Sequence, residues 1–280
     1  MTLNFSSLDW LSGIISLIIC CLNNQPNLIT KDQFTPKIYA MLCQKYKPTI
    51  SFLPPRHVAS LIATHADSEI FASIRFLLIG GDSFKYDSMK KIQQLFPKAV
   101  LGCCYGFTEF GLNIAQNIGL KKSNSVGSLS ANIKLRIVDD NGANLGANEE
   151  GEIWVWNKIP WRGYYENPKE TALAMDEDNW IRTGDMGYMD EDNCLFISGR
   201  KKEIFKYQGF MYWPGEIEKV IKAAGGKRLR SVEVFDVYTG ENVGINEKSI
   251  AYTLTFNDYE KTLSDEEVTN AFNKIIKEVT

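Results

Sequence analysis

Apolar side chains in the N-terminal part of the chain follow two alternating patterns. Short continuous apolar runs end at proline or glycine, which is typical of buried strands. Between them lie segments in which apolar residues recur every three or four positions, which is typical of helices. The expected strands are 50–55, 74–79 and 99–104, and the expected helices are 33–45, 56–64 and 86–96. This alternation predicts an α/β fold, a mostly parallel sheet with helices on its faces.

Residues 8–22, LDWLSGIISLIICCL, form the most apolar run of the chain. The run is too short to span a bilayer and contains Asp9. It also lacks the basic flank and small-residue cleavage site of a signal peptide. We therefore expect a buried helix here and no membrane association.

The pattern changes after about residue 125. Residues 134–138 and 152–156 have strand character, and Asn141-Gly142 is the expected hairpin turn between them. We expect three regions: an α/β part over 1–124, a β-rich subdomain over 125–200, and a small α+β domain over 201–280. Trp154, Trp156 and Trp161 cluster in the second region, where core packing is the default role and ligand stacking the alternative.

The C-terminal pattern predicts helix, strand, strand, helix. An amphipathic helix begins near Pro214, and residues 231–238 and 249–256 alternate as half-buried strands. Ser264 is the expected N-cap of the last helix, with Glu267 at the reciprocal position of a capping box.

Composition narrows the possible functions. The formal net charge of −3 argues against a chain that binds nucleic acid or anionic membranes over its whole surface. The chain has 6 cysteines and 2 histidines, and no C-x-x-C pair occurs, which argues against a zinc site. Free thiols are typical of a reducing compartment, so we expect a cytoplasmic protein.

Two turns carry residues suited to nucleotide chemistry. Tyr105-Gly106 directly follows an expected strand, and a glycine turn lets backbone N–H groups approach a phosphate. The Thr108 hydroxyl and the Glu109 carboxylate beside it could hold a phosphate oxygen and Mg²⁺. The alternative is a plain turn with Glu109 as a surface acid. Gly80-Gly81 ends another expected strand, and ligands of parallel sheets bind at such carboxyl ends.

A third turn, Thr183-Gly184-Asp185, presents one carboxylate. An ionised carboxylate accepts two donors and so suits the two hydroxyls of a ribose. Arg200 follows closely and could hold the sugar or its phosphate. A salt bridge from Arg200 to an acid such as Asp190 is the alternative.

The whole stretch 182–218 resembles the signature of the adenylate-forming family, which includes acyl-CoA synthetases, 4-coumarate–CoA ligases and luciferase-like enzymes. That signature combines a TGD turn with GR-x-K-[DE]-x-I-K-x-x-G-x-x-x-x-P-x-E-[IL]-E. The matching positions are Gly199, Arg200, Lys202, Glu203, Lys206, Gly209, Pro214, Glu216, Ile217 and Glu218. The resemblance covers residues 5–218 and implies an AMP-binding large domain.

The resemblance implies a role for each matched nucleotide contact. The Gly80-Gly81 backbone lies along the adenine and the acyl pocket, and Tyr105 flanks the adenine beside Gly106. Thr108 contacts the α-phosphate as a catalytic residue, and Glu109 is catalytic and holds Mg²⁺. Asp185 binds the ribose, and Arg200 binds ribose or phosphate. Asp82 stands where the family has alanine, and its alternative role is a helix N-cap.

The resemblance further places a domain hinge at Lys202 and a thioester-forming contact at Lys206 and Gly209. A solvated surface lysine is the alternative for Lys202. The implied reaction joins a fatty or aromatic carboxylic acid to CoA through an acyl-adenylate, with ATP/AMP, Mg²⁺ and CoA as cofactors.

Two family motifs have no match in this sequence: the phosphate loop S-G-T-T-G-x-P-K-G and the lysine-bearing P-x-T-x-x-G-K-x-x-R. Because loss of a preorganised charge typically costs several kcal/mol of transition-state stabilisation, we expect a truncated enzyme with little or no adenylation activity of its own. The alternative is a non-catalytic nucleotide-binding remnant.

Residues 219–280 resemble a different family, the ferredoxin-fold anticodon-binding domain that ends the β chain of phenylalanyl-tRNA synthetase. The runs Phe235–Gly240 (FDVYTG) and Thr262–Val268 (TLSDEEV) carry this resemblance. It implies a fusion and a tRNA contact through 219–280. We expect that contact to be weak, because no basic-aromatic face is evident there.

Overall fold

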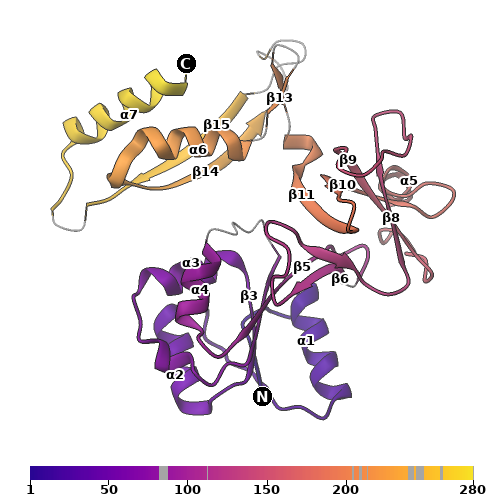
Figure 1. The fold of residues 1–280 in the computed structure, drawn as a ribbon, viewed down its shortest axis with the longest axis horizontal. Helices are drawn as coiled ribbons and strands as arrows, with labels where there is room; N and C mark the ends of the chain where they lie inside the picture. Colours follow the sequence, from indigo (N-terminus) through magenta and orange to yellow (C-terminus); the bar gives the residue numbers. More distant parts are fainter. Residues whose placement is uncertain are drawn as a thin grey trace. The chain divides into compact units, whose positions relative to one another are not determined.

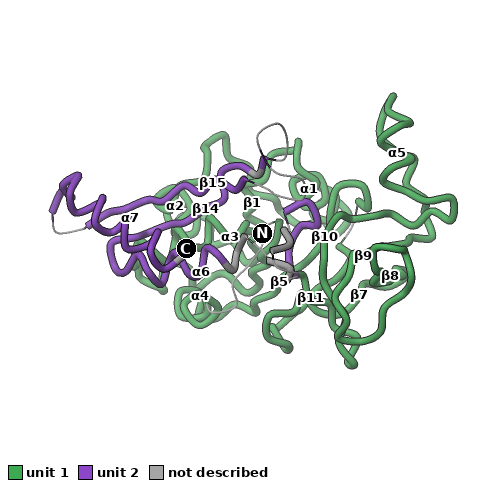
Figure 2. Tube along the Cα trace, turned by 90° about the horizontal axis from the view of Figure 1, so that it is seen from above, with its two compact units in different colours: residues 1–197 green, residues 198–280 purple. Residues whose placement is uncertain are grey.

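The computed structural model describes residues 1–81, 88–111, 113–203, 205–207, 210–212, 214–238, 243, 249–258 and 261–279, without the side chains of 205–207, 210–212, 214–216, 237 and 279. The chain forms two compact units, Met1–Ile197 and Ser198–Thr280 (Figure 2). Each unit is described by itself.

The N-terminal part of the first unit is a parallel sheet. Its strands are β1 (Thr2–Asn4), β2 (Asn27–Leu28), β3 (Ile50–Leu53), β4 (Phe76–Gly80) and β5 (Val100–Gly106). They lie in the order β2-β1-β3-β4-β5, and each neighbouring pair runs parallel. The helices between them are α1 (Leu11–Leu22), α2 (Pro36–Tyr46), α3 (Pro55–Ala63) and α4 (Met89–Leu95), with a 3-10 turn at Ser68–Phe71. The predicted α/β architecture is therefore confirmed.

Helix α2 begins at Pro36, within the segment that the apolar pattern predicts to be helical. Thr35 is extended, its hydroxyl accepts a hydrogen bond from the Ile38 N–H, and Pro36 occupies the first helical position, where it needs no hydrogen-bond donor. Figure 1 shows α2, α3 and α4 together on one side of the parallel strands, with α1 on the other.

The main core lies between the sheet and these three helices. It includes the fully buried Tyr39, Phe71 and Phe96, whose ring centroids lie 5.1–6.4 Å apart. Burying large aromatic side chains gives the largest hydrophobic contribution per residue. This aromatic cluster fixes the helices against β3, β4 and β5, and so fixes the strand ends that carry the candidate site.

The expectation of a buried helix over 8–22 is half wrong. The helix is present as α1, but only Gly13 and Cys20 along it are buried, whereas Leu22 is 80% exposed. Gly13 gives the close contact with the rest of the unit, since a Cβ there would lie 2.1 Å from the Ser7 carbonyl oxygen. The apolar run predicted burial, but only one side of the helix has a neighbour among the described residues.

The second half of the unit continues the sheet with antiparallel strands. These are β6 (Asn113–Ile118), β7 (Gly127–Leu129), β8 (Ile133–Val138), β9 (Gly151–Asn157), β10 (Ile181–Met189) and β11 (Cys194–Arg200), with α5 at Pro168–Ala174. The described strands form one hydrogen-bonded sheet that continues from β5 in the order β6-β7-β11-β10-β9-β8. The predicted hairpin joins β8 to β9 in antiparallel register.

The tryptophans of this region divide between two roles. Trp161 packs against the buried core of this region, which includes Ile114, Val155 and Leu195, as predicted. Trp154 and Trp156 alternate with the buried Ile153 and Val155 and lie on the opposite face of β9. There Trp154 lies beneath the guanidinium of Arg136, 4.6 Å from its ring centroid, so cation–π stacking replaces core packing.

The second unit is smaller. It contains a 3-10 turn at Lys201–Glu203, β12 (Phe205–Tyr207), β13 (Phe210–Tyr212), α6 (Pro214–Gly225), a 3-10 turn at Gly226–Arg228, β14 (Leu229–Tyr238), β15 (Ser249–Phe256) and α7 (Asp265–Val279). The predicted order helix, strand, strand, helix is confirmed for α6-β14-β15-α7. Ile221, Ala224, Val232 and Ile275 form its buried core.

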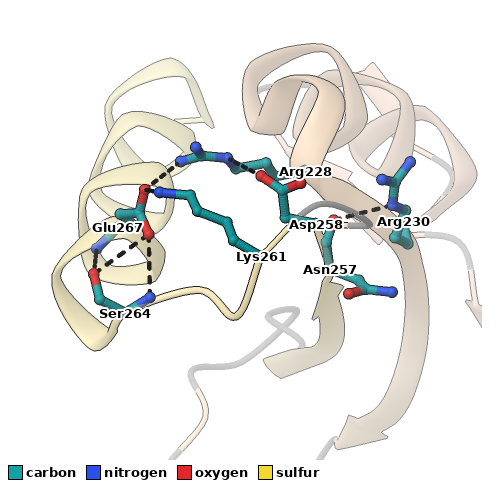
Figure 3. A network of polar contacts seen from close by, with 7 residues as sticks. All are labelled: Arg228, Arg230, Asn257, Asp258, Lys261, Ser264 and Glu267. Atoms are coloured by element: carbon teal, nitrogen blue, oxygen red, sulfur yellow. Dashed lines mark hydrogen bonds and ion pairs between the residues drawn. The ribbon is translucent and has the colours of Figure 1, made fainter.

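The predicted capping box is present at the start of α7. The Glu267 N–H donates to the Ser264 hydroxyl at 3.3 Å, and the Ser264 N–H donates to Glu267 Oε2 at 3.2 Å (Figure 3). Both bonds satisfy N–H groups that a helix start leaves without partners.

Candidate functional site

The site begins at the carboxyl edge of β4 and β5, two neighbouring parallel strands. Gly80 pairs in register with Cys104, so Gly80-Gly81 and Tyr105-Gly106 lie side by side. Tyr105 and Gly106 are the last residues of β5 and pair with β6, so the turn predicted there begins only after Gly106. A Cβ on Gly80 would lie 2.7 Å from the Cys104 sulfur, which explains why glycine occupies this position. The structure thus brings together two of the three turns that the sequence singled out.

The third predicted turn, Thr183-Gly184-Asp185, lies within β10, where the pairing with β9 is irregular, and it reaches the same place through a side-chain contact. The Tyr105 hydroxyl donates a hydrogen bond of 2.5 Å to Asp185 Oδ2, and this bond joins residues 80 positions apart in the sequence. Asp185 is 5% exposed, although carboxylates are rarely buried without partners. The phenol therefore holds a buried carboxylate beside the carboxyl end of β5.

The backbone around Asp185 is held from both sides. Gly184 has a φ of 68°, a left-handed conformation that costs glycine little. The Thr183 hydroxyl accepts from the Asp185 N–H at 2.9 Å and donates to the Ile153 carbonyl at 2.8 Å. These bonds fix the backbone of this irregular part of β10 against β9, and the Tyr105 bond orients the carboxylate.

Glu109 has a partner that the sequence did not predict. Residues 107–111 form a tight turn after β5, in which Thr108 is exposed and its carbonyl accepts from the Gly111 N–H at 3.1 Å. Glu109 lies in this turn, and its Oε1 accepts a hydrogen bond from the Tyr164 hydroxyl. That hydrogen bond raises the pKa of Tyr164 to about 12. The Glu109 carboxylate is therefore oriented by a second phenol.

Tyr164 could have been suspected from its surroundings in the sequence. It follows Gly163, whose φ is 91°, and precedes the N-cap Asn167 of α5. The Trp161 ring packs edge-on against the Tyr164 ring at 4.7 Å. Aromatic side chains next to a glycine, outside any strand pattern, are a weak indication of a positioned loop. Only the folded chain shows that this loop reaches Glu109.

Two further acids of the first unit, Asp190 and Asp192, belong to an ion-pair cluster. Lys122 Nζ lies 2.9 Å from Asp190 Oδ2 and 2.6 Å from Asp192 Oδ2. The Lys122 hydrogen bond lowers the pKa of Asp190. Asp190, suggested above as an alternative partner for Arg200, therefore pairs with Lys122.

The remaining predicted contacts fall in the second unit or outside the described residues. Arg200 is exposed at the end of β11, and Lys202 is exposed in the following 3-10 turn. The backbone of Lys206 lies in β12, but its side chain is outside the description. Asp82 and Gly209 also lie outside the described residues. These residues stay predictions.

The assembled groups suit a nucleoside monophosphate. Asp185 supplies a positioned acceptor, Tyr105 an aromatic ring, and the two glycine turns supply backbone N–H groups and space. Glu109 fits a Mg²⁺ ligand of the kind that shares the ion with substrate phosphates.

Among the described residues, no group of three or more acids, cysteines or histidines could hold a metal ion by itself. No helix of the described residues is long and apolar enough to cross a membrane.

Two family models match the chain. The model for AMP-binding enzymes matches residues 1–165, and the model for the ferredoxin-fold anticodon binding domain matches residues 214–280. The second match covers the α6-β14-β15-α7 unit, and both matches agree with the resemblances drawn from the sequence.

Known proteins support the first match. A 4-coumarate–CoA ligase of Vanilla planifolia is 33% identical over 214 residues, covering 74% of this chain and 39% of that protein. The rice enzyme, 4-coumarate–CoA ligase 3, is 34% identical and is likewise covered over 39% of its length. The chain therefore spans about two fifths of the length of these curated relatives.

Solved structures show the same fold. The luciferase-like enzyme of the mealworm Zophobas morio superposes with a TM-score of 0.65 at 30% identity, over 73% of this chain and 49% of that one. The O-succinylbenzoate CoA synthetase of Bacillus subtilis, in complex with AMP, has a TM-score of 0.74 at 20% identity, over 98% of this chain and 54% of that one. With more than half of its residues matching the family model, and with the strand-end turns of the site on that matched segment, this chain belongs to the AMP-binding enzyme family.

Proposed function

We propose that the chain is the nucleotide-binding part of an adenylate-forming acid–CoA ligase and binds AMP and ATP through Tyr105 and Asp185. The observation that carries the proposal is the hydrogen bond between these two side chains at the carboxyl edge of β5. A ribose hydroxyl would replace one of the groups that donate a hydrogen bond to the Asp185 carboxylate. The Tyr105 ring would flank the base. Burial strengthens such hydrogen bonds because little water competes for the carboxylate.

The phosphate end of the ligand would extend along the turn that carries Thr108 and Glu109. Thr108 is exposed and free to turn its hydroxyl to a phosphate oxygen, and Glu109 is oriented by Tyr164. Mg²⁺, when bound, would neutralise phosphate charge, with Glu109 as its protein ligand. Arg200 and Lys206 would act in the same reaction on the ribose or phosphate and on the thioester-forming face.

The reaction of the complete enzyme would be two group transfers. A carboxylate oxygen of a fatty or aromatic acid attacks the α-phosphorus of ATP, and pyrophosphate leaves. The CoA thiol then attacks the acyl carbon, loses its proton, and AMP leaves as the thioester forms. We propose that this chain supplies the nucleotide site that both transfers use.

Calorimetric titration of the whole chain with AMP tests the binding proposal. We expect a single site whose affinity falls roughly tenfold or more in Asp185→Asn, since a hydrogen bond to a charged group contributes about 1.5–3 kcal/mol. Asp178→Asn is the matched control, because Asp178 is exposed in the loop before β10. Absence of AMP binding, or equal affinity in wild type and Asp185→Asn, would contradict the proposal.

A second candidate function is a weak tRNA contact through 219–280. It is favoured by the match of residues 214–280 and by Arg230, Phe235 and Tyr238, which are exposed on β14. It is opposed by charge, since residues 219–280 contain 10 acidic and 9 basic residues and so carry no net positive charge. A gel-shift titration with tRNA at low salt tests it. A shift that disappears in Phe235→Ala supports the contact, and no shift at low salt removes it.

A further inference from the structure

The loop between β9 and α5 carries two neighbouring tyrosines with different surroundings. Residues 158–167 read KIPWRGYYEN. Tyr165 is 90% exposed, whereas Tyr164 is 40% exposed and donates its hydroxyl to Glu109 Oε1. The side chain of Tyr164 is therefore directed at the turn that follows β5, while that of its neighbour is directed at solvent.

The Tyr164 backbone is anchored to α5. Its N–H donates to the Thr171 hydroxyl at 2.9 Å, and that hydroxyl donates to the Asn167 carbonyl at 2.8 Å. Asn167 in turn caps α5, because its side-chain oxygen accepts from the Glu170 N–H at 3.2 Å. Tyr164 is thus tied to the first turns of a helix, although it lies in a loop.

Two further contacts fix the direction of the Tyr164 side chain. Gly163 has a φ of 91°, and a Cβ there would lie 2.4 Å from Thr171 Cγ2, so the loop passes directly against α5. The Trp161 ring meets the Tyr164 ring edge-on, and Trp161 itself packs against the buried core of this region. Aromatic pairs prefer such edge-on arrangements. These contacts hold the phenol in place without help from Glu109.

A phenol that is held in this way restricts the Glu109 side chain. A glutamate side chain has several rotatable bonds, and fixing it costs conformational entropy. Tyr164 occupies Oε1, and Oε2 accepts no hydrogen bond from the described part of the chain. Carboxylates that bind metal ions are normally hydrogen-bonded themselves, and these outer contacts orient the ligating oxygen. The protein therefore fixes one Glu109 oxygen and leaves the other available to a cation.

We propose that Tyr164 is a positioning residue for the divalent cation that accompanies ATP, and that it acts through Glu109. This inference rests on the proposed function, in which Glu109 is the Mg²⁺ ligand. It gives the loop before α5 a task at the phosphate end of the nucleotide. Tyr105 and Asp185 serve the base and the ribose, so AMP binding without Mg²⁺ does not need Tyr164.

Nucleotide titrations of the whole chain test the proposal. Calorimetry gives the affinity for ATP with excess Mg²⁺ and with EDTA, and the affinity for AMP with EDTA. In wild type Mg²⁺ should strengthen ATP binding. In Tyr164→Phe this strengthening should fall about tenfold, the size typical of losing an outer contact to a metal ligand, while AMP affinity stays unchanged. Tyr165→Phe is the matched control and should behave as wild type, because its side chain is 90% exposed.

The outcomes of this titration separate the inference from the function on which it rests. Absence of AMP binding in wild type would overturn both. AMP binding together with an unchanged Mg²⁺ effect in Tyr164→Phe would overturn the inference alone. Equal losses of ATP and AMP affinity in Tyr164→Phe would also overturn it, because they would indicate a general disturbance of the site.

A second comparison shows whether Tyr164 acts through Glu109. Glu109→Gln removes the carboxylate charge and should abolish most of the Mg²⁺ effect on ATP binding. Adding Tyr164→Phe to Glu109→Gln should then change ATP affinity no further, because residues that act through one another are non-additive. A further loss in the double variant, or a loss in Tyr164→Phe that persists in EDTA, would mean that the phenol contacts phosphate directly and would overturn the positioning role.

Discussion

The two units stabilise their charged groups in opposite ways. In the first unit, Asp185 is 5% exposed and accepts a hydrogen bond from Tyr105, which lies 80 positions earlier in the sequence. In the second unit, Glu267 lies in an open cluster with Lys261, Arg228 and the capping residue Ser264 (Figure 3). The first arrangement depends on a large core, and the second depends on residues at the ends of its strands and the start of α7.

The difference in burial between the two carboxylates distinguishes a binding-site residue from a residue that only stabilises local structure. A buried carboxylate costs solvation energy and is justified by a ligand or a fixed partner, so it indicates a site. An exposed ion-pair cluster contributes little to stability and mainly fixes a helix start. We therefore propose nucleotide chemistry for Asp185 and a structural role for Glu267, and four variants test this division.

The largest effect is expected in the aromatic core of the first unit. Phe71→Ala removes a fully buried ring that contacts Tyr39 and Phe96, and should lower the free energy of unfolding by about 3–5 kcal/mol. Urea unfolding followed by circular dichroism measures the change. Phe235→Ala is the control, because Phe235 is 78% exposed, and should change stability by less than about 0.5 kcal/mol. Equal losses of stability in Phe71→Ala and Phe235→Ala would show that the buried and the exposed aromatic side chains contribute equally.

Tyr105→Phe should have the next largest effect. It keeps the ring and removes the donor to Asp185, which leaves a buried acceptor less satisfied and should cost about 1–2 kcal/mol. Thermal unfolding in the absence of nucleotide is the measurement. Tyr165→Phe, at a position that is 90% exposed, should be neutral. If Tyr105→Phe unfolds at the same temperature as wild type, the hydrogen bond from Tyr105 to Asp185 does not contribute to stability.

Ser264→Ala tests the helix start in the second unit. It removes the hydroxyl that accepts from the Glu267 N–H, and loss of such a cap costs about 1 kcal/mol. Denaturant unfolding of the second unit, followed at Tyr252 or by hydrogen exchange in α7, detects the loss. Ser249→Ala at the exposed start of β15 is the control. The cap is unimportant if both variants unfold at the same denaturant concentration.

The smallest effect concerns pH. The Lys261 hydrogen bond, with that of the Ser264 N–H, lowers the pKa of Glu267 from 4.5 to about 2. Because the folded pKa is depressed, the ionised form stabilises the fold above about pH 4.5, and this stabilisation is lost as the pH falls toward 2. Glu267→Gln should therefore differ from wild type at pH 7 and converge with it near pH 2. Glu266→Gln should show no such convergence, and a constant difference for Glu267→Gln would refute the ion-pair explanation.

Much of the fold follows from local sequence patterns. The strands β3, β4 and β5, the helices between them, and the order of elements in the second unit were predictable because their apolar spacing and turn residues act within a few positions. The capping box was predictable for the same reason, since Ser264 and Glu267 are three residues apart. The end of β4 at Gly80 was likewise predictable from the local pattern, whereas β5 continues through Tyr105 and Gly106, where a turn was predicted.

Two features depended on distant parts of the chain. The exposure of α1 could not be read from its apolar run, because burial depends on what packs against it. The Tyr164 contact to Glu109 joins a loop to a turn 55 residues away, and no local rule sets that distance.

The sequence by itself determined the elements, the turns and the family, because these depend on short-range spacing and on residue types in register. Only the tertiary structure decided that Tyr105 meets Asp185, because their separation of 80 residues is closed by a sheet that runs through β5 and β10. It also decided that α1 presents its apolar side outward. Contacts made across a sheet depend on the packing of the whole unit, and residue patterns along the chain do not specify them.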